Sequence, residues 1–346
     1  MSTTIVTGEA LKRFTTAAFM TSGMTEADAQ TVAEVLVWAN LRGIDTHGVV
    51  RIPRYLELIG IGDMNPRPDI RIRSDAPAAL MLDADRAIGP VAMTRGMSAA
   101  IEKARSAAIG MTLVRATTHT AALGYYTLMA ARQNMVGIAI SGSWPNMAYH
   151  GAWAAAISTA PISIAVPGGA KGPVVLDMGT GIVSVGKLNQ AKRSGKPIPA
   201  GWALDQSGRP STDPATAQTP LPMAGPKGAG LSLMIEFLTG ALSGNPILAD
   251  YLTDTGDQKR HRQNGLVIAI DIARFTDPSH FAREVERMVT ILKALPRDPD
   301  VLEILVPGER GERVFQQRSS AGIPLPVGVL AALRSVAERL ALPPLI

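Results

Sequence analysis

The chain has 346 residues, enough for two or three domains, and its 46% hydrophobic and 18% charged content is typical of a folded protein. It contains no cysteine, which excludes disulfides, thiolate nucleophiles, zinc ribbons and iron–sulfur clusters. The net charge of +5 is scattered and aromatic residues make up only 4%, so a small anionic cofactor or substrate explains the charge better than a nucleic acid. No run approaches the ~18 apolar residues that cross a bilayer and no secretory signal is visible, so we expect a cytoplasmic protein without membrane contact.

Apolar periodicity predicts that helices dominate the start of the chain. They are expected, in chain order, at residues 7–21, 25–41 and 50–60, followed by a proline-rich loop at 64–69. In the second helix, Thr25 and Asp28 form a capping-box pattern ahead of an apolar stripe. The stripe consists of Ala29, Val32, Leu36 and Ala39.

Strands and helices alternate over the rest of the chain. The predicted elements are a strand and turn at 79–86, helix 89–107, strand 111–117, helix 127–134, strands 136–141, 162–168 and 173–178, helix 231–242, a strand leading into a turn at 265–275, helix 279–294, a strand and turn at 302–310 and helix 326–341. Residues 181–188 fit either a strand or a helix, and residues 195–217 are predicted to be a loop rich in Pro and Gly.

This alternation predicts a mixed α/β fold (α+β) in which both ends of the chain are helical and the middle is rich in strands. We therefore expect a helical domain built from both termini, residues 1–75 with 311–346. A connecting α/β region is expected at 76–118, and a sheet domain at 119–310.

Two motifs that bind nucleotides are absent: the dinucleotide fingerprint G-x-G-x-x-G and the phosphate loop G-x-x-x-x-G-K-[ST]. GTGIVSVG (179–186) begins like the fingerprint but misplaces its last glycine. GPKGAGLSLMIEFL (225–238) is the better phosphate candidate, because small residues allow a close approach and the helix behind them would point N-terminal amides at an anion. Lys227 adds a positive charge. A glycine turn that only starts a buried helix is the other interpretation.

RGIDTHGVVR (42–51) carries the strongest catalytic candidates. His47 can give or take a proton at a carbonyl oxygen, and Thr46 can hydrogen-bond to it or to a substrate. Arg51 follows four residues later and suits a carboxylate in two-point contact. A proton donor beside a carboxylate clamp is what a 2-oxo acid reductase requires. The alternative is a helix end that carries Arg and His to complement its dipole.

The other four histidines give weaker signals. His119 follows a predicted strand, where side chains often line a cleft, although a turn histidine bonded to the backbone fits as well. His150 has no acidic partner nearby in sequence, and His261 and His280 are expected at the surface. No H-x-x-x-H or H-E-x-x-H spacing occurs, so no metal site is expected, and the G-x-S-x-G pattern of serine hydrolases is also missing.

Seven stretches occur in a defined order over nearly the whole chain. They are RGIDTHGVVRIPRY (42–55), HTAALGYYTLMAA (119–131), PISIAVPG (161–168), LDMGTGIVSVGKL (176–188), GKPIPAGWALDQSGRPSTDP (195–214), GPKGAGLSLMIEFLTGALSG (225–244) and VPGER (306–310). Together they resemble the type 2 malate/L-lactate dehydrogenase family of non-Rossmann NAD(P)-dependent oxidoreductases. That family also includes ureidoglycolate, sulfolactate and diketogulonate enzymes and piperideine-2-carboxylate reductases.

The resemblance implies roles for five polar residues. His47 matches the proton donor of the family, and Thr46 stands at the position of its hydroxyl partner. Arg51 matches the contact to the substrate carboxylate, and Lys187 stands at a second substrate-contacting position. In some members the histidine that matches His119 is itself the acid–base group.

The resemblance also implies a homodimer and a sheet domain that binds NAD or NADP without a Rossmann fold. The positions that match cofactor contacts are His119, Thr120, Ala121, Ala122, Leu123, Ser141, Asp177, Met178, Gly179, Lys227, Gly228, Ile304, Leu305, Val306, Pro307, Gly308, Glu309 and Arg310.

Some segments depart from the family pattern. HTAALG (119–124) is closer to the H-F-A-A-L of piperideine and pyrroline carboxylate reductases than to the H-F-G-A-A-G of many members. Those reductases carry an acid near the position of Lys187, which is here as in the malate and lactate enzymes. STAP (158–161) replaces G-T-N-P, and SGSWPNMAYHGAW (141–153) differs as well.

The expected function is hydride transfer between nicotinamide and C2 of a small anionic 2-oxo or 2-hydroxy acid. The turn at 119–124 also suits an NADPH-dependent reductase of cyclic 2-imino acids. A non-catalytic relative that binds a nucleotide is a third possibility, because of the departures at 141–153 and 158–161. Arg310 is a candidate for meeting a 2′-phosphate or for facing solvent, so NAD and NADP both stay open.

Overall fold

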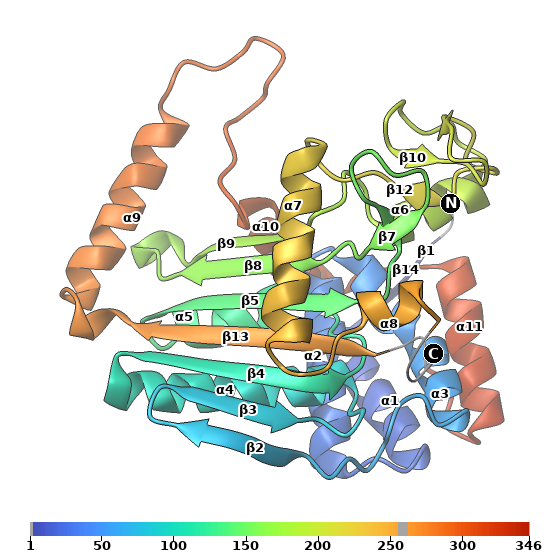
Figure 1. Cartoon of the computed structure of the whole chain (residues 1–346), viewed down its shortest axis with the longest axis horizontal. Coiled ribbons are helices and arrows are strands. Elements are labelled where there is room, and N and C mark those ends of the chain that lie inside the picture. The colour runs from blue at the N-terminus through green and yellow to red at the C-terminus, as the bar shows by residue number, and fades with distance from the viewer. Residues whose placement is uncertain (1–2, 255–261, 346) are drawn as a thin grey trace.

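The structure, a computed structural model, describes residues 3–254 and 262–345 and is built around one seven-stranded sheet (Figure 1). The strands, in spatial order, are β2 (Arg71–Ala76), β3 (Ala79–Asp83), β4 (Ile109–Thr117), β13 (Gln263–Asp271), β5 (Met135–Ser143), β8 (Pro161–Val166) and β9 (Val174–Gly179). β3 and β4 pair in parallel, whereas the other neighbours in this sheet are antiparallel. Such a sheet is not the doubly wound parallel sheet of the Rossmann fold. The prediction of a mixed α/β, non-Rossmann fold is confirmed.

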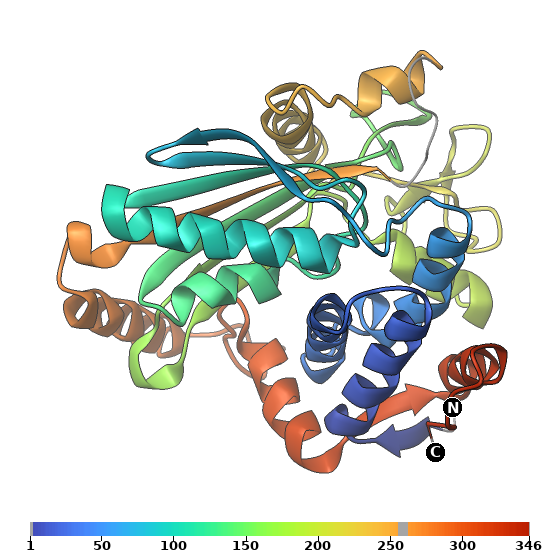
Figure 2. The same cartoon turned by 90° about the horizontal axis from the view of Figure 1, so that it is seen from below.

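Helices cover both faces of the sheet. α4 (Gly89–Ala107) and α5 (Gly124–Ala131) pack on one face, and α7 (Pro226–Glu236) packs on the other (Figures 1 and 2). A Cβ atom on Gly110 would lie 1.9 Å from the carbonyl oxygen of Ala100, inside α4. Glycine is therefore required at this point of β4, because any side chain would push the helix off the strand.

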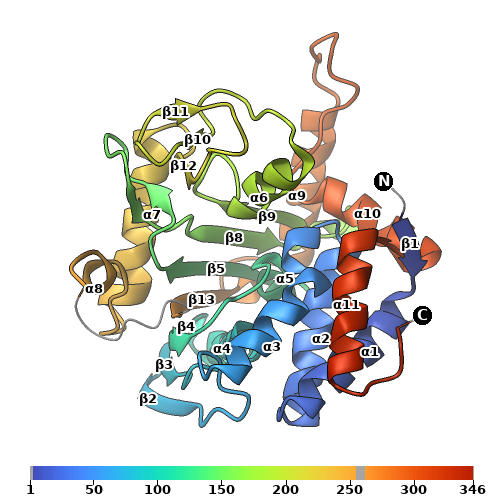
Figure 3. The same ribbon diagram turned by 90° about the vertical axis from the view of Figure 1, so that its right-hand side faces the viewer.

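A further layer of helices comes from both ends of the chain (Figures 2 and 3). Its members are α1 (Gly8–Thr21), α2 (Glu26–Leu41), α3 (Ile52–Gly60), α10 (Glu309–Ala321) and α11 (Val327–Arg339). Strand β1 (Thr3–Val6) pairs with β14 (Ile323–Pro326), so the two ends of the chain are joined by backbone hydrogen bonds.

The largest hydrophobic core runs without interruption from these helices into the sheet. It includes Leu36 of α2, Tyr55 of α3, Met93 of α4, Val267 of β13 and Leu333 of α11, all of them buried. Each such side chain contributes about 1.5–3 kcal/mol of burial free energy. The helical layer is therefore fixed against the sheet, which matters because the two layers carry different parts of the site.

The remaining elements lie around the sheet. They are β6 (Met147–Ala148), β7 (Ala155–Ile157), α6 (Val185–Ser194), β10 (Ala203–Leu204), β11 (Pro210–Ser211), β12 (Thr219–Pro220), α8 (Leu248–Leu252) and α9 (Pro278–Lys293). α9 and the irregular segment after it project from one edge of the molecule (Figure 1). Within the described residues, no helix combines the length and the apolar composition that crossing a bilayer requires.

The second helix begins as its capping pattern predicts. The hydroxyl of Thr25 accepts a hydrogen bond from the backbone N–H of Asp28 at 3.2 Å, and the predicted apolar stripe of α2 is fully buried. The carboxylate of Asp28 does not return to the helix start but accepts from Arg95 of α4 at 2.8 Å. The cap therefore also joins α2 to α4.

One prediction near the C-terminal end of the sheet region is wrong. Residues 302–310 do not form a strand: the segment is irregular up to Gly308, and Glu309 begins α10, which the sequence did not predict. Leu302 is 91% exposed, so the apolar run that it opens does not line a buried sheet face. The apolar run had suggested a buried strand, but the segment pairs with no other strand.

Two helices begin several residues earlier than predicted, and one ambiguous segment leads into a helix. α5 begins at Gly124 instead of 127, directly after the turn that contains His119. α7 begins at Pro226 instead of 231 and continues as the π-helix η4 (Phe237–Ala241). The ambiguous segment 181–188 ends in the first residues of helix α6.

Candidate functional site

Thr46, His47 and Arg51 lie on a connection between α2 and α3 that is neither helix nor strand. Two short 3-10 turns, Asp45–His47 and Val49–Arg51, meet at Gly48. The direction in which His47 points is therefore fixed by side-chain contacts to this connection and not by a regular helix.

The imidazole of His47 has a hydroxyl neighbour. The Oγ1 atom of Thr46 lies 3.0 Å from Nδ1 of His47. A hydroxyl can donate to a bare Nδ1 or accept from a protonated one, so Thr46 supports both tautomers of the neutral ring. Nε2 of His47 can then change its protonation state while Nδ1 keeps a partner.

His119 joins His47 from another part of the chain. The two rings stack with centroids 5.5 Å apart and planes tilted by 23°. Nδ1 of His119 lies 2.6 Å from the hydroxyl of Tyr55 and accepts from the N–H of Ala121 at 3.3 Å. The N–H donor at Nδ1 favours the tautomer that carries its proton on Nε2.

The backbone is strained at the end of β4 and in the turn that follows it. Ala116 and Ala121 have φ angles of +53° and +55°, in the left-handed region that side chains disfavour. Residues held in this region often cluster at functional sites, where the surrounding structure keeps them in place. Here the two alanines lie on either side of His119.

Charge and burial keep His47 neutral at physiological pH. Burial, and second the positive charge of Arg51, lower the pKa of His47 to about 4. Burial also raises the pKa of the Tyr55 hydroxyl, which keeps it protonated. Nε of Arg51 donates to the carbonyl oxygen of Thr46 at 2.7 Å, so the guanidinium lies against the turn that carries His47.

Helix α6 closes over this turn. A Cβ atom on Gly186 would lie 3.1 Å from Cγ2 of Thr46, so the first turn of α6 is in contact with the turn that carries His47. The side chain of Lys187 is exposed, and its backbone N–H is bonded to the Ser184 cap at 3.2 Å. The predicted substrate-contacting lysine therefore stands on an element that adjoins the turn with Thr46 and His47.

The other predicted segments meet along β9. Oδ2 of Asp177 accepts from the N–H of Gly124 at 2.8 Å, which joins β9 to the end of the His119–Leu123 turn. Burial raises the pKa of Asp177 to about 6, against the opposing effects of the Gly124 N–H and Arg42.

The predicted segment 304–310 lies beside the same strand. The N–H of Val175 donates to the carbonyl oxygen of Pro307 at 3.2 Å. Gly308 has a φ of +86°, and a Cβ atom there would lie 2.9 Å from the carbonyl oxygen of Val175. Arg42 donates to the carbonyl oxygen of Gly308 at 3.0 Å. β9 thus stands between the His119 turn and the segment expected to contact the distal part of the cofactor.

The glycine turn before α7 differs from the expected anion cradle. The N–H of Gly228 donates to Met223 at 3.0 Å and the N–H of Lys227 to Ala224 at 3.4 Å, so both amides are used within the turn. A Cβ atom on Gly228 would lie 2.5 Å from the Met223 carbonyl, so backbone packing already explains this glycine. The exposed side chain of Lys227 remains as the cation at this turn.

One further observation suits the binding of a nicotinamide coenzyme by these segments. The hydroxyl of Thr180, which directly follows Gly179, is fully buried and has no hydrogen-bond partner within the described part of the chain. The backbone of Thr180 adjoins the turn before α7, since Met223 donates to its carbonyl at 2.9 Å. An unpaired polar atom between two predicted cofactor segments suits a polar ligand.

Ser141 is used inside the sheet. Its hydroxyl donates to the carbonyl of Asn264 at 3.0 Å and to Oε1 of Gln263 at 3.4 Å. The same Oε1 atom accepts from the N–H of Thr120 at 3.2 Å, so Gln263 links Ser141 to the His119 turn. Sequence reasoning missed Gln263, and it also missed Tyr55, whose position on the buried face of α3 gave no sign of a contact with His119.

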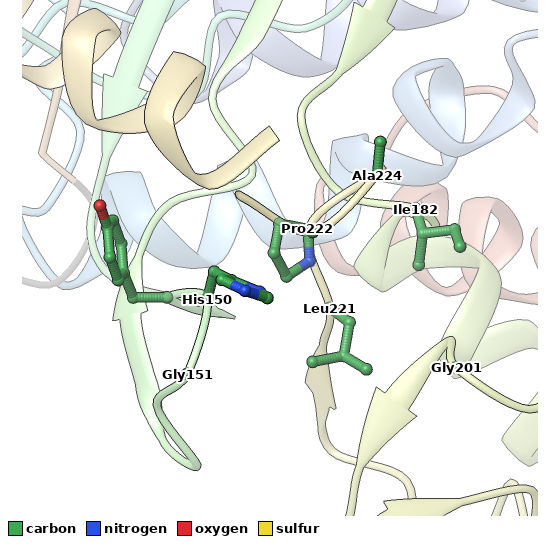
Figure 4. A pocket seen from close by; sticks show the side chains of 9 residues that line it. His150, Gly151, Ile182, Gly201, Leu221, Pro222 and Ala224 are labelled. Carbon is green, nitrogen blue, oxygen red and sulfur yellow. The ribbon is translucent and has the colours of Figure 1, made fainter. Parts of the chain in front are cut away.

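A cavity of about 320 Å³ adjoins the turn before α7 (Figure 4). It lies between the β6–β7 hairpin, which carries His150, and the segment that contains Pro222 and Gly225. His150 is thus an exposed lining residue. His280 is exposed on α9 as predicted, and His261 lies outside the described residues. Residues 3–254 and 262–345 hold no group of three or more potential metal ligands.

The non-Rossmann sheet, the two stacked imidazoles and the arginine beside them suit an oxidoreductase that acts on a small anionic substrate. The family model for malate/L-lactate dehydrogenase matches residues 6–334. The chain belongs to the malate/L-lactate dehydrogenase family and is an enzyme of the dehydrogenase class.

Three relatives show the range of this family. Malate dehydrogenase of Pyrococcus horikoshii is 36% identical over 327 residues, which cover 92% of this chain and 90% of that protein. The crystal structure of malate dehydrogenase from Entamoeba histolytica superposes with a TM-score of 0.94 at 27% identity, over 99% of both chains. The structure of delta1-piperideine-2-carboxylate reductase from Pseudomonas syringae superposes with a TM-score of 0.85 at 27% identity, over 96% of this chain and 100% of that one.

Proposed function

We propose that this enzyme transfers hydride between nicotinamide C4 and C2 of a small anionic 2-oxo or 2-hydroxy acid. The observation that carries the proposal is the meeting of His47, His119 and Arg51 around one turn, with the two imidazoles stacked at 5.5 Å. The relatives that are named malate dehydrogenases support a hydroxy acid as the substrate class. NAD is the proposed coenzyme, with NADP as the alternative.

In this proposal each side chain has one task. The coenzyme supplies the hydride in reduction and accepts it in oxidation. The terminal nitrogens of Arg51 hold the substrate carboxylate in two-point contact. His47 gives a proton to the carbonyl oxygen during reduction and takes it from the hydroxyl during oxidation. Thr46 keeps Nδ1 of His47 hydrogen-bonded in both states, and His119 borders the same space, held by Tyr55.

The charge of the substrate acts on His47. Because Arg51 contributes to the low pKa of His47, a carboxylate bound to Arg51 offsets that contribution and favours proton uptake by the imidazole. A neutral His47 suits oxidation of a hydroxy acid, whereas reduction of a 2-oxo acid needs the protonated ring. Substrate binding therefore prepares His47 for the reductive direction.

Four segments are proposed to hold the coenzyme: the His119–Leu123 turn, the Asp177–Gly179 end of β9, the turn with Lys227 and Gly228, and residues 304–310. Two observations support this proposal. Hydrogen bonds join the His119–Leu123 turn and residues 304–310 to β9, and the unpaired hydroxyl of Thr180 lies next to the end of β9 and the turn before α7. Lys227 provides the positive charge for a phosphate.

We also propose that the protein is a cytoplasmic homodimer. α9 and the segment after it expose apolar side chains, a pattern that often marks a protein interface. They are Met288, Ile291, Leu292, Leu295, Val301, Leu302 and Leu305. Analytical ultracentrifugation of the wild type and of Ile291→Asp tests this. A dimer that dissociates in the variant supports the proposal, and a wild-type monomer contradicts it.

Oxidation of NADH and NADPH with pyruvate, oxaloacetate and piperideine-2-carboxylate, measured side by side, tests the main proposal. Turnover of a 2-oxo acid is the expected result. The HTAAL turn and the likeness to the piperideine-2-carboxylate reductase favour the cyclic imino acid as a second candidate, which turnover of that substrate alone would establish. Nucleotide binding without turnover of any substrate would contradict both and indicate a non-catalytic relative.

A further inference from the structure

Three side chains that touch no proposed reactant surround the turn with Thr46 and His47. Asn40 lies in the last turn of α2 and is only 3% exposed. Asp45 opens the first 3-10 turn, and Arg318 reaches it from α10.

Asn40 spans the turn from one side to the other. Its Oδ1 atom accepts from the N–H of Val49 at 2.8 Å, and its Nδ2 atom donates to Oδ1 of Asp45 at 2.7 Å. The two bonded residues lie on either side of Thr46, His47 and Gly48. Because both ends of the amide are used, its orientation is fixed and the length of the turn is set by one planar group.

Gly48 shows how closely the turn follows this amide. A Cβ atom at this position would lie 2.1 Å from Oδ1 and 2.4 Å from Cγ of Asn40. The φ angle of Gly48 is −91°, which any residue can adopt, so glycine is needed here for space.

Arg318 fixes the other side of Asp45. Its Nη1 and Nη2 atoms donate to the two carboxylate oxygens at 2.7 and 3.2 Å, and Nη1 also donates to the backbone carbonyl of Asn40. A forked contact of this kind restricts the orientation of the carboxylate. The carboxylate of Asp45 is thus held by the amide of Asn40 and the guanidinium of Arg318 at once.

The helix that carries Arg318 also holds a proposed cofactor segment. Glu312, on the same helix, accepts from Nη1 of Arg42 at 2.6 Å, and Nη2 of Arg42 donates to the carbonyl of Gly308 at 3.0 Å. α10 is therefore bonded to the turn of His47 near one end and to the 304–310 segment near the other. The position of α10 therefore affects how His47 lies relative to the proposed coenzyme segment.

We propose that Asn40, Asp45 and Arg318 are positioning residues that align His47 for proton transfer. The inference rests on the proposed role of His47 and adds what holds that residue in place. Proton transfer depends steeply on geometry, and a displacement of about 1 Å can cost about 10²-fold in rate. Loosening the turn should therefore slow the proton-transfer step and leave nucleotide binding intact.

The test compares Asn40→Ala, Asn40→Asp, Arg318→Gln and Arg318→Lys with the wild-type enzyme. Asn40→Asp keeps the acceptor for Val49 but sets a carboxylate against Asp45, and Arg318→Lys keeps the charge but loses the forked contact. Gln317→Ala on the exposed face of α10 is the matched control. For each protein we would measure kcat, KM, the dissociation constant of NADH, the solvent deuterium isotope effect on kcat and the melting temperature.

We expect kcat to fall by about 10²-fold in Asn40→Ala and about tenfold in Arg318→Gln, because the turn is freed from one or both sides. The solvent isotope effect should rise as proton transfer becomes slower, while NADH affinity and Gln317→Ala activity stay at wild-type values. Arg318→Lys should recover part of the loss, and Asn40→Asp should not.

Two results would overturn the inference. One is wild-type kcat in Arg318→Gln and in both Asn40 variants while His47→Ala is inactive. The other is a parallel loss of kcat, NADH affinity and melting temperature, which would show a general structural role. If Asn40→Ala does not fold, the kcat and isotope effect of Arg318→Gln decide. Full activity of His47→Ala would instead contradict the role proposed for His47, on which this inference rests.

Discussion

The positive charge of Arg51 affects two groups: the substrate carboxylate that Arg51 is proposed to bind, and the imidazole of His47 next to it. Its charge is the second cause, after burial, of the low pKa of His47. Its Nε atom is bonded to the carbonyl of Thr46, so the guanidinium cannot move far from the turn. The charge that is proposed to attract an anionic substrate thus also keeps His47 uncharged.

His47→Ala should lower kcat by about 10²–10⁴-fold, the usual contribution of a positioned general acid or base. Steady-state kinetics with the best 2-oxo acid from the panel would measure this. Near-normal turnover would assign the proton transfer to His119, the other imidazole of the stacked pair.

Arg51→Gln should move the acid limb of the pH profile for hydroxy acid oxidation to higher pH. His47 works as a base only when neutral, and its pKa of about 4 should rise towards the ordinary value of 6.5 once the charge of Arg51 is removed. Arg51→Lys, which keeps the charge, serves as the control: its limb should stay near that of the wild type while KM rises. If the acid limb lay at the same pH in all three proteins, the charge of Arg51 would have no effect on the pKa of His47.

Glycine contacts decide the packing of whole elements, and α4 on β4 is the clearest case. Gly110→Ala would place a methyl group 1.9 Å from the carbonyl of Ala100, so the helix has to shift. We expect a loss of about 1–3 kcal/mol in the free energy of unfolding, as for other overpacked sites. Gly328→Ala in α11 meets no atom within 4 Å and should be neutral or slightly stabilising. Urea unfolding of both variants would measure this, and equal stabilities would contradict the close packing.

Elements with a buried apolar face could be predicted from the sequence, and those without one could not. The stripe of α2 predicts both the helix and its buried side. α10 has no buried residue and β2 is exposed along its whole length, so neither carries an apolar periodicity that could predict it. Residues 302–310 carry an apolar run without any strand beside it, which is why that prediction failed.

The same reasoning explains which parts of the site were predictable. Thr46, His47 and Arg51 lie within six residues, so their chemistry is visible as a local pattern. The stacking of His47 on His119, the contact of His119 with Tyr55 and the contact of Asp45 with Arg318 depend on how α3, the β4 turn and α10 pack, and no local pattern encodes that. The turn before α7 has the glycines of an anion site, yet its amides bond to neighbouring carbonyls.

Two groups with shifted pKa values, His47 and Asp177, should contribute to how the stability of the whole molecule depends on pH. The folded pKa of His47, about 4, lies below its ordinary 6.5, so His47 costs stability progressively as pH falls from 6.5 towards 4. The folded pKa of Asp177, about 6, lies above its ordinary 3.8, so Asp177 costs stability as pH rises from 3.8 through 6.

Asp177→Asn should therefore raise the melting temperature above pH 6 and leave it unchanged below 3.8. The amide keeps an oxygen for the N–H of Gly124 but removes the buried charge. Thermal melts across this pH range would measure the difference between variant and wild type. A lower melting temperature of the variant above pH 6 would show that the carboxylate is stabilised by its surroundings when ionised.

The helical layer and the sheet are proposed to bring His47, Arg51 and the nicotinamide ring to one point. A crystal structure of the enzyme with NADH and oxamate, an unreactive analogue of a 2-oxo acid, tests this most directly. We expect the oxamate carboxylate on Arg51, its carbonyl oxygen at Nε2 of His47 and nicotinamide C4 facing the carbon that would receive the hydride. A nicotinamide ring bound elsewhere, with His47 and Arg51 facing solvent, would contradict it.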